Sequence, residues 1–460
     1  MIVKRSKIRH MHIESNIVLH TKTIHHMIKK ILILILLISG GQIMFCQNKS
    51  IGYWIGTMKR EDSAMDVSFE FNILKNHIAG YFNSASQRAS GIPLDEVTVK
   101  NDSLTFHLMT EPVSLFKCKV SFDTISGQII QEGFSKGNLS LKRSQLPVKS
   151  YTSIDTTFKS DNARIACRIY FPKAKGKFPA VVFMHGSGGE GMFANQFFAE
   201  YLASKGIVSL IQDKRGVGKS TGNWTTAGFD ELANDHIHAV NFLKGFDKVN
   251  TSQIGIYGHS QGGTIAPLVA SKSKDIAFVI AASGIGDTVY KQDLYRTENN
   301  LKSNGFTQKE VQEAIHYYKS WLDMARLGTG YEKLDSLNQS SKNKKWFEWV
   351  EAPPRDNWIW KFYIQIGNYN SLDYWKKTNI PVFLIYGEND QIEDIRSYIH
   401  NIDKVLTEQA HNKDLTQIIL PNAQHNLCIS PEKNEKFFWW YLSPGYPDLI
   451  AGWIVYRFKN

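Results

Sequence analysis

The hydrophobic and polar positions follow two different rhythms along this chain. Over 51–143, apolar and polar side chains alternate with a period of two, as in 65–71 (MDVSFEF). Such alternation predicts strands that have one buried and one solvated face. Turn-forming residues such as Asn101-Asp102 separate these runs. We therefore predict a small all-β module over 47–144.

A second rhythm begins beyond 145–151 (QLPVKSY), which we interpret as a linker. Short, nearly continuous apolar runs now alternate with amphipathic stretches that have a helical pattern. Continuous apolar runs are typical of strands buried on both faces of a parallel sheet, and alternating β and α units indicate a doubly wound α/β domain. We predict this domain over 145–460, with a mostly parallel sheet. Its predicted strands are 178–184, 206–213, 254–257, 278–282, 381–386 and 417–420.

Residues at about 287–378 interrupt this alternation. They are polar, helical in pattern and hold six of the eleven tryptophans of the chain. An insertion of this length between two core strands predicts a helical cap over the edge of the sheet where ligands bind. Packing of the cap explains most of its aromatic side chains, which leaves one or two to line a substrate pocket.

The basic charge of the chain is concentrated at its amino terminus. The 460 residues carry 54 Lys and Arg against 43 Asp and Glu, a net charge of +11. Residues 1–46 hold seven of the basic side chains and a single acid, so the rest of the chain has a net charge of only +5. This distribution removes the main compositional argument for a nucleic-acid partner.

The apolar run at 31–38 (ILILILLI) follows Lys29-Lys30 and precedes small residues. This layout is typical of a secretory signal peptide, and the run is shorter than the roughly 20 residues that span a membrane. We predict a leader over 1–46, with Met27 as a candidate start, and export to the periplasm or the outside of the cell. Attachment of a lipid at Cys46 is the alternative.

Three cysteines follow the leader, at Cys118, Cys167 and Cys428. An odd and sparse set does not form a disulfide framework, and no pair has the spacing of metal ligands. We therefore expect no structural metal and no cofactor.

A G-x-S-x-G pattern stands at Gly258-His259-Ser260-Gln261-Gly262, directly after the predicted strand 254–257. Between a strand and a helix, this pattern forms a sharp turn that exposes the serine hydroxyl at the helix N-terminus. Serine in such a turn is a candidate nucleophile. A purely structural serine in a glycine-rich turn is the alternative.

Three other motifs directly follow predicted strands: 185–189 (HGSGG), 387–390 (GEND) and 422–425 (NAQH). The carboxyl ends of parallel strands form the edge of the sheet where ligands bind. A glycine-rich loop at this edge can present a backbone amide to an oxyanion. The order Ser, Asp, His along the chain is that of α/β-hydrolases.

Together with 213–220 (DKRGVGKS), these motifs make the region from about residue 151 to 460 resemble the α/β-hydrolase superfamily. It is most similar to secreted esterases and acyl hydrolases related to the serine aminopeptidase-like group. The resemblance implies that Ser260 is the nucleophile, His425 the general base and acid, and Asp390 the carboxylate that orients the histidine. It also implies an oxyanion hole formed by the backbone amides of Ser187 and Gln261. Other acids close to the GEND motif remain alternatives to the third member: Glu388, Glu393 and Asp394.

The start of the β module, Gly52-Tyr53-Trp54, is similar to the Gly-x-Trp that opens lipocalin-type barrels. We favour a packing or spacer role for the module over ligand binding.

These observations predict an exported serine esterase that cleaves a small-molecule ester through an acyl-serine intermediate. A serine aminopeptidase or amidase is one alternative, and a non-catalytic binding protein on a hydrolase scaffold is another. The aminopeptidase would need acids in the cap that hold a free amine. The candidates are Asp287, Asp293, Glu298, Glu310 and Glu313.

Overall fold

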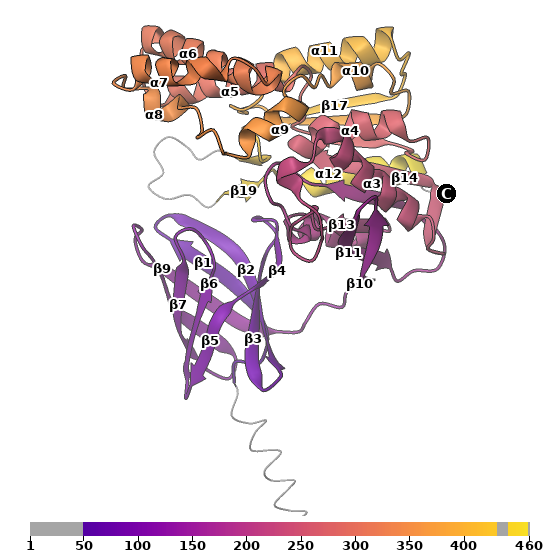
Figure 1. Cartoon of the computed structure of the whole chain (residues 1–460). Coiled ribbons are helices and arrows are strands. Elements are labelled where there is room, and N and C mark those ends of the chain that lie inside the picture. The colour runs from indigo at the N-terminus through magenta and orange to yellow at the C-terminus, as the bar shows by residue number, and fades with distance from the viewer. Residues whose placement is uncertain (1–48, 430–439, 459–460) are drawn as a thin grey trace, which may run out of the picture. The chain divides into compact units, whose positions relative to one another are not determined.

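The computed structural model describes residues 49–429 and 440–458 (Figure 1). The predicted leader over 1–46, with Met27 and Cys46, lies outside the described residues. In the described part of the chain, no helix is long and apolar enough to cross a membrane.

The chain divides into two compact units. The first runs to Phe82 and resumes with Ile92–Leu146, and the second combines Asn83–Gly91 with Pro147–Asn460.

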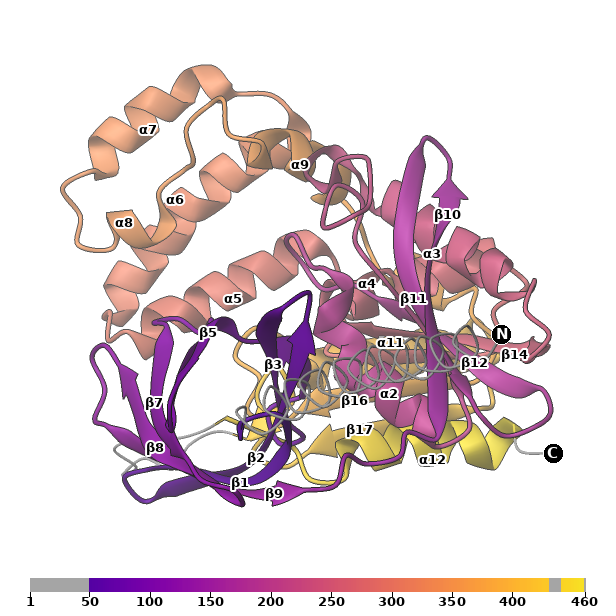
Figure 2. The ribbon, with the colours of Figure 1, turned by 90° about the horizontal axis from the view of Figure 1, so that it is seen from below.

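A curved antiparallel sheet of nine strands makes up most of the first unit (Figures 1 and 2). The order of the strands across the sheet is β4-β3-β2-β1-β9-β8-β7-β6-β5. The predicted all-β module is thus confirmed. Its strands are β1 (Gly52–Arg60), β2 (Ser63–Leu74), β3 (His77–Ser84), β4 (Ala89–Pro93), β5 (Asp95–Lys100), β6 (Ser103–Leu108), β7 (Ser114–Val120), β8 (Thr124–Gln131) and β9 (Gly137–Ser144).

Alternation along these strands builds an aromatic core on one face of the sheet. Phe69 on β2 is fully buried, as are Phe106 and Phe116 on β6 and β7, whose ring centroids lie 4.5 Å apart. On the paired strands β1 and β9, Trp54 lies opposite Arg143, and the guanidinium carbon lies 4.2 Å from the centroid of the indole ring. This cation–π contact ties the first strand of the unit to its last.

The second unit is built on an eight-stranded sheet in the order β10-β11-β13-β12-β14-β15-β16-β17. The pairs β10–β11 and β11–β13 are antiparallel, and every other pair in this sheet is parallel. The predicted doubly wound, mostly parallel sheet is thus confirmed. Its strands are β10 (Tyr151–Ser160), β11 (Ala163–Pro172), β12 (Phe178–Met184), β13 (Val208–Gln212), β14 (Val249–His259), β15 (Val279–Ala282), β16 (Val382–Gly387) and β17 (Leu415–Leu420).

Helices cover both faces of this sheet because its central strands are apolar on both faces. Val182 on β12 packs into a core with helices α3 and α4, and its neighbour Val181 packs into a second core with α2 and α12. Each face therefore has its own hydrophobic core. The helices are α2 (Gln196–Ser204), α3 (Phe229–Leu243), α4 (Gln261–Lys272), α11 (Ile395–Glu408) and α12 (Tyr446–Phe458), with the short turns η1 (Met192–Asn195) and η2 (Trp224–Thr226).

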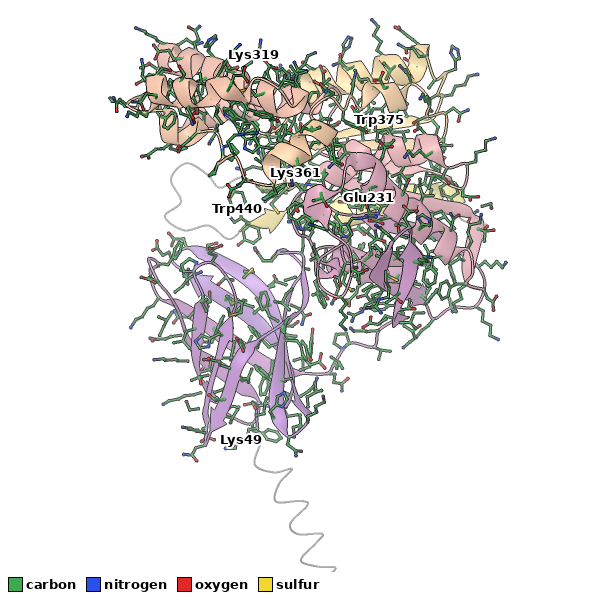
Figure 3. The ribbon with its side chains drawn as sticks, in the orientation of Figure 1. Lys49, Glu231, Lys319, Lys361, Trp375 and Trp440 are labelled. Atoms are coloured by element: carbon green, nitrogen blue, oxygen red, sulfur yellow. The ribbon has the colours of Figure 1, made fainter. Side chains whose placement is uncertain are left out.

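A helical insertion lies between β15 and β16, within the range where the sequence predicts a cap (Figure 1). Its longest helix carries a capping box, in which Thr307 and Glu310 exchange hydrogen bonds at the first turn. Lys319 on this helix points to solvent (Figure 3), whereas Trp321 packs inward. The elements are α5 (Val289–Ser303), α6 (Gln308–Leu327), η3 (Tyr331–Lys333), α7 (Leu334–Ser341), α8 (Phe347–Val350), α9 (Ile359–Ile366) and α10 (Leu372–Trp375).

A short antiparallel pair of strands, β18 (Cys428–Ile429) and β19 (Tyr441–Leu442), follows β17.

Candidate active site

Ser260 occupies the sharp turn between β14 and α4, in a backbone conformation (φ 55°, ψ −118°) that serine rarely adopts. The turn needs glycine on both sides. A Cβ atom on Gly258 would lie 2.3 Å from the carbonyl carbon of Gly262, and a Cβ atom on Gly262 would lie 2.9 Å from the carbonyl oxygen of His185. The Ser260 amide donates to the Ala282 carbonyl oxygen at 2.9 Å. Packing against neighbouring strands thus holds a strained turn that presents the hydroxyl.

The structure brings Ser260, His425 and Asp390 into one hydrogen-bonded chain. The distance from His425 Nε2 to Ser260 Oγ is 2.9 Å, and that from His425 Nδ1 to Asp390 Oδ2 is also 2.9 Å. The second carboxylate oxygen of Asp390 accepts the backbone amides of Ile392 at 2.8 Å and Glu393 at 3.0 Å. A carboxylate held in this way keeps a proton on Nδ1 and leaves Nε2 free to accept one from the serine.

The other acids close to the GEND motif have different partners. Glu388 accepts the backbone amide of Asn422, and Asp394 accepts the amide of Ser397 as the N-cap of α11. Glu393 lines a cavity, which is described below. Of these carboxylates, the structure places Asp390 at hydrogen-bonding distance from His425.

Two further histidines lie near this chain. Burial lowers the pKa of His185 to about 3, and its Nε2 donates to the carbonyl oxygen of Gln212. Burial also lowers the pKa of His259 to about 4. Nε2 of His259 donates to the carbonyl oxygen of His425 at 2.8 Å, and the hydroxyl of Ser283 donates to the same oxygen at 2.9 Å. Both histidines are therefore neutral near pH 7, and His259 helps to fix the backbone of His425.

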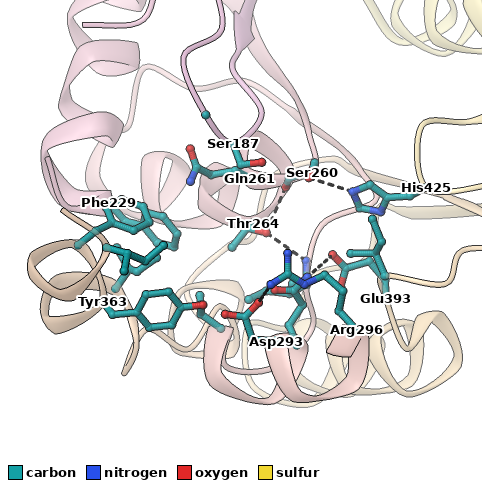
Figure 4. Close-up of a pocket in the computed structure, with 18 of the residues that line it drawn as sticks. Ser187, Phe229, Ser260, Gln261, Thr264, Asp293, Arg296, Tyr363, Glu393 and His425 are labelled. Atoms are coloured by element: carbon teal, nitrogen blue, oxygen red, sulfur yellow. Dashed lines mark hydrogen bonds and ion pairs between the residues drawn. The ribbon is translucent and has the colours of Figure 1, made fainter. Parts of the chain in front are cut away.

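Ser260 and His425 open onto a cavity of about 400 Å³ (Figure 4). The predicted oxyanion residues Ser187 and Gln261 line the same cavity beside Ser260. Asp390 is not among the lining residues, and its side chain, which contacts His425 Nδ1, is fully buried. The walls combine residues of the hydrolase core with residues of the helical insertion. The apolar lining residues are Trp224, Phe229, Ile285, Val289, Trp358, Ile359, Phe362, Tyr363, Ile366 and Ile392.

Charged side chains gather at the end of the cavity opposite Ser260 (Figure 4). Asp293 pairs with Arg296 on α5, and Glu393 accepts a long 3.4 Å hydrogen bond from Gln292. Burial raises the pKa of Asp293, against the effect of Arg296. Burial also raises the pKa of Glu393 well above its ordinary value, and the charge of Asp390 adds to this effect.

The sequence alone does not identify this charged group as a unit. Asp293 is predicted only as one of the acids of the cap, and Glu393 only as an alternative to Asp390. No pattern in the sequence points to Arg296. One oxygen of Asp293 and one of Glu393 are buried without a hydrogen-bond partner. Because buried polar atoms are usually paired, these oxygens mark the polar end of the cavity as a place for a hydrogen-bond donor.

Among residues 49–429 and 440–458, no group of three His, Cys, Asp or Glu side chains is arranged to hold a metal ion. The hydrogen bond between Ser260 and His425 supports nucleophilic chemistry, because the imidazole can take the proton of the serine hydroxyl.

Comparisons with known proteins show which family and which relatives this chain is similar to. Residues 161–426 match the model of the family described as X-Pro dipeptidyl-peptidase (S15 family). Esterase EstD of Thermotoga maritima is 26% identical over 304 residues, which are 63% of this chain and 65% of EstD. Acyl-coenzyme A thioesterase 1 of Rattus norvegicus is 27% identical over 186 residues, or 36% of this chain and 42% of the thioesterase. The chain thus spans less than two thirds of the length of either relative.

Among solved structures, an esterase of Pyrococcus furiosus aligns with a TM-score of 0.43 and 18% identity, over 67% of this chain and 92% of the esterase. The matched region of the S15 model holds more than half of the chain, including Ser260, Asp390 and His425. The α/β-hydrolase resemblance seen in the sequence motifs is confirmed, and the chain belongs to the S15 family of α/β-hydrolases.

Proposed function

We propose that this protein is a serine hydrolase that cleaves carboxylic esters through an acyl-serine intermediate. The hydrogen-bonded chain from Ser260 through His425 to Asp390, at the wall of a largely apolar cavity, is the observation that carries the proposal. The similarity to an esterase and to thioesterases supports the same chemistry on an acyl group.

In the acylation step, Ser260 Oγ attacks the ester carbonyl carbon while His425 Nε2 takes the hydroxyl proton. The carbonyl oxygen becomes an oxyanion, which the backbone amides of Ser187 and Gln261 stabilise. Removal of one such donor typically costs about 100- to 1,000-fold in turnover. Collapse of the intermediate breaks the bond to the alcohol oxygen, which leaves with the proton from His425.

In the deacylation step, water takes the place of the alcohol. His425 removes a proton from the water as it attacks the acyl carbon, and then returns the proton to Ser260 as the acid departs. Asp390 keeps the imidazole in the required tautomer throughout and stabilises its cationic form. The apolar walls suit an acyl group of modest size, since the cavity is near the lower end of the range for small-molecule sites.

A second candidate function is the removal of N-terminal residues from peptides. The family description names such a peptidase, and the carboxyl groups of Asp293 and Glu393 at the end of the cavity supply the acids that a free amine would need. Cleavage of an amide uses the same three residues and the same oxyanion hole. The two candidates therefore differ in what the cavity accepts.

A paired assay tests both candidates. Purified protein is offered short-chain p-nitrophenyl esters and, separately, alanyl-prolyl and alanyl p-nitroanilides, with Ser260→Ala as the control. We expect ester cleavage that is lost in Ser260→Ala, whose melting temperature stays within about 2 °C of the wild type. Anilide cleavage at comparable kcat/KM would favour the peptidase. Ester turnover that survives the substitution would contradict the proposed nucleophile.

We also propose that the protein is exported, on the basis of the leader composition over 1–46. Mass spectrometry of protein isolated from its own host tests this proposal. The expected N-terminus lies near Gln47. An intact leader would contradict export, and a lipid on Cys46 would replace secretion by anchoring.

A further inference from the structure

Lys214 is a buried cation that lies beside the proposed oxyanion hole, and the catalytic chain does not use it. It belongs to the loop 213–220 (DKRGVGKS) that follows β13, and only 3% of it is exposed. Its neighbour Arg215 forms a buried ion pair with Asp235 on α3. The preceding Asp213 accepts the backbone amides of Met192 and Lys219. The loop is thus fixed on both sides of Lys214.

The ammonium group of Lys214 has three N–H donors, and the structure provides three acceptors for it. They are the carbonyl oxygen of Gly186 at 2.8 Å, the carbonyl oxygen of Gly188 at 2.9 Å and Oε1 of Gln261 at 2.8 Å. Two of these acceptors belong to the HGSGG loop, and the third belongs to the first residue of α4. A single side chain therefore connects the two segments that carry the proposed oxyanion donors.

The geometry of the peptide bond gives these contacts a consequence for catalysis. The carbonyl group of Gly186 and the amide N–H of Ser187 belong to the same planar peptide unit and point in opposite directions. When Lys214 holds the oxygen of that unit, it fixes the direction of the N–H on the other side. A cation at the oxygen also polarises the unit and makes its N–H a stronger donor. The bond to the Gln261 side chain restrains the residue that supplies the second donor.

We propose that Lys214 is a positioning residue that aligns both oxyanion donors, Ser187 and Gln261, for the transition state. The inference rests on the proposed function, because it assigns a role within the same acyl-transfer site. It predicts that Lys214 affects the binding of an oxyanion far more than the binding of the neutral substrate.

The titratable groups that face Lys214 set the pH range in which this role operates. Burial lowers the pKa of Lys214 to about 8, while the nearby Glu190 acts in the opposite direction. His185 and His236 also face it, and the pKa of each is lowered to about 3, so both are neutral above pH 5. The ammonium therefore loses a proton, and with it one of its three donors, as the pH rises through about 8.

Lys214→Met removes the charge and keeps much of the side-chain length, and Lys219→Met is the matched control on the exposed part of the same loop. We expect Lys214→Met to lower kcat about 10- to 100-fold for p-nitrophenyl acetate, with KM changed less than about threefold, because small misalignments of catalytic groups cost this much. Lys219→Met should retain wild-type values. We expect the kcat of the wild type to fall as the pH rises above about 8, because Lys214 then loses its charge. This fall should be absent in Lys214→Met.

The decisive readout is the inhibition constant of a short alkyl trifluoromethyl ketone, which adds to the serine as an anionic hemiketal. Lys214→Met should weaken it by the same factor as kcat, and the matching methyl ketone should bind as before. Lys214→Gln, which keeps two N–H donors, replaces the methionine variant if that variant does not fold. Its loss of kcat and of ketone inhibition should lie between those of the wild type and Lys214→Met. Unchanged ketone inhibition, or equal losses in Lys219→Met, would overturn the proposal. If the wild type shows no ester turnover that depends on Ser260, the proposed function is wrong. The role of Lys214 can then still be tested, because ¹⁹F NMR measures the binding of the trifluoromethyl ketone to the wild type and to Lys214→Met without any turnover.

Discussion

Replacing Asp390 by asparagine should disable His425 without disturbing the fold, because the backbone dictates how the new amide is oriented. The carboxylate oxygen that faces away from His425 accepts two amides, those of Ile392 at 2.8 Å and Glu393 at 3.0 Å. In an asparagine side chain, only the oxygen can accept these two amides. The NH₂ group of the asparagine then faces Nδ1 of His425, so Nδ1 has to become a hydrogen-bond acceptor. The ring proton moves to Nε2, and Ser260 loses its base.

The size of the effect follows from the cost of the opposite orientation. Turning the amide to recover the productive tautomer would point its NH₂ group at the part-buried N–H group of Ile392 and the buried N–H group of Glu393, and would leave both without an acceptor. Each unsatisfied donor costs about 1–3 kcal/mol, so the productive arrangement is disfavoured by about 2–6 kcal/mol. At 1.36 kcal/mol per factor of ten, kcat should fall between about 30-fold and about 10⁴-fold.

The assay is the steady-state hydrolysis of p-nitrophenyl acetate, with circular dichroism and thermal unfolding as checks on the fold. Asp394→Asn is the matched control: Asp394 caps α11, and asparagine caps a helix about as well as aspartate. We expect the control to keep the wild-type kcat. A folded Asp390→Asn variant that kept more than a third of wild-type kcat would refute this reasoning.

Two further substitutions test the surroundings of the site. Gly258→Ala should lower the free energy of unfolding by more than about 2 kcal/mol in urea denaturation, because the new Cβ atom would lie 2.3 Å from the backbone of Gly262. The control is Gly452→Ala, at an open helical position, which should be neutral or stabilising. Similar losses of stability in both variants would contradict the packing argument. Glu393→Gln should become progressively more stable relative to the wild type as the pH rises from about 4.5. The raised pKa of Glu393 means that the folded protein binds its proton more tightly than the unfolded chain does, so the wild type loses stability on ionisation. A stability difference between the two proteins that did not change with pH would show that Glu393 is not perturbed.

The fold was largely predictable from the sequence because its central strands are apolar on both faces. The runs at 178–184 and 381–386 match β12 and β16 to within a residue at each end. The sequence does not predict the antiparallel pair β10 and β11. β10 is an edge strand whose side chains are mostly polar and exposed, so it has no apolar run, and its first residue, Tyr151, lies within the predicted linker.

Residues of the candidate site were predictable from the sequence only where they belong to short motifs of neighbouring residues. Ser260 and Asp390 belong to short motifs that follow strands directly, and strand ends meet at one edge of a parallel sheet. The contacts of Lys214 join segments that lie 26 to 47 residues apart along the chain. The charged end of the cavity brings together Asp293 on α5 and Glu393 in the loop between β16 and α11. Spacing in the sequence does not reveal which acids of a polar helix point inward.

The proposal of an acyl-serine mechanism is tested most directly by locating the covalent intermediate. The full chain is reacted with an alkyl fluorophosphonate, digested and mapped by mass spectrometry, with His425→Ala as a control in which the serine has lost its base. The account predicts a single stoichiometric adduct on Ser260 that abolishes ester hydrolysis and forms at least 100-fold more slowly in the control. An adduct on another residue, or complete loss of activity without modification of Ser260, would contradict it.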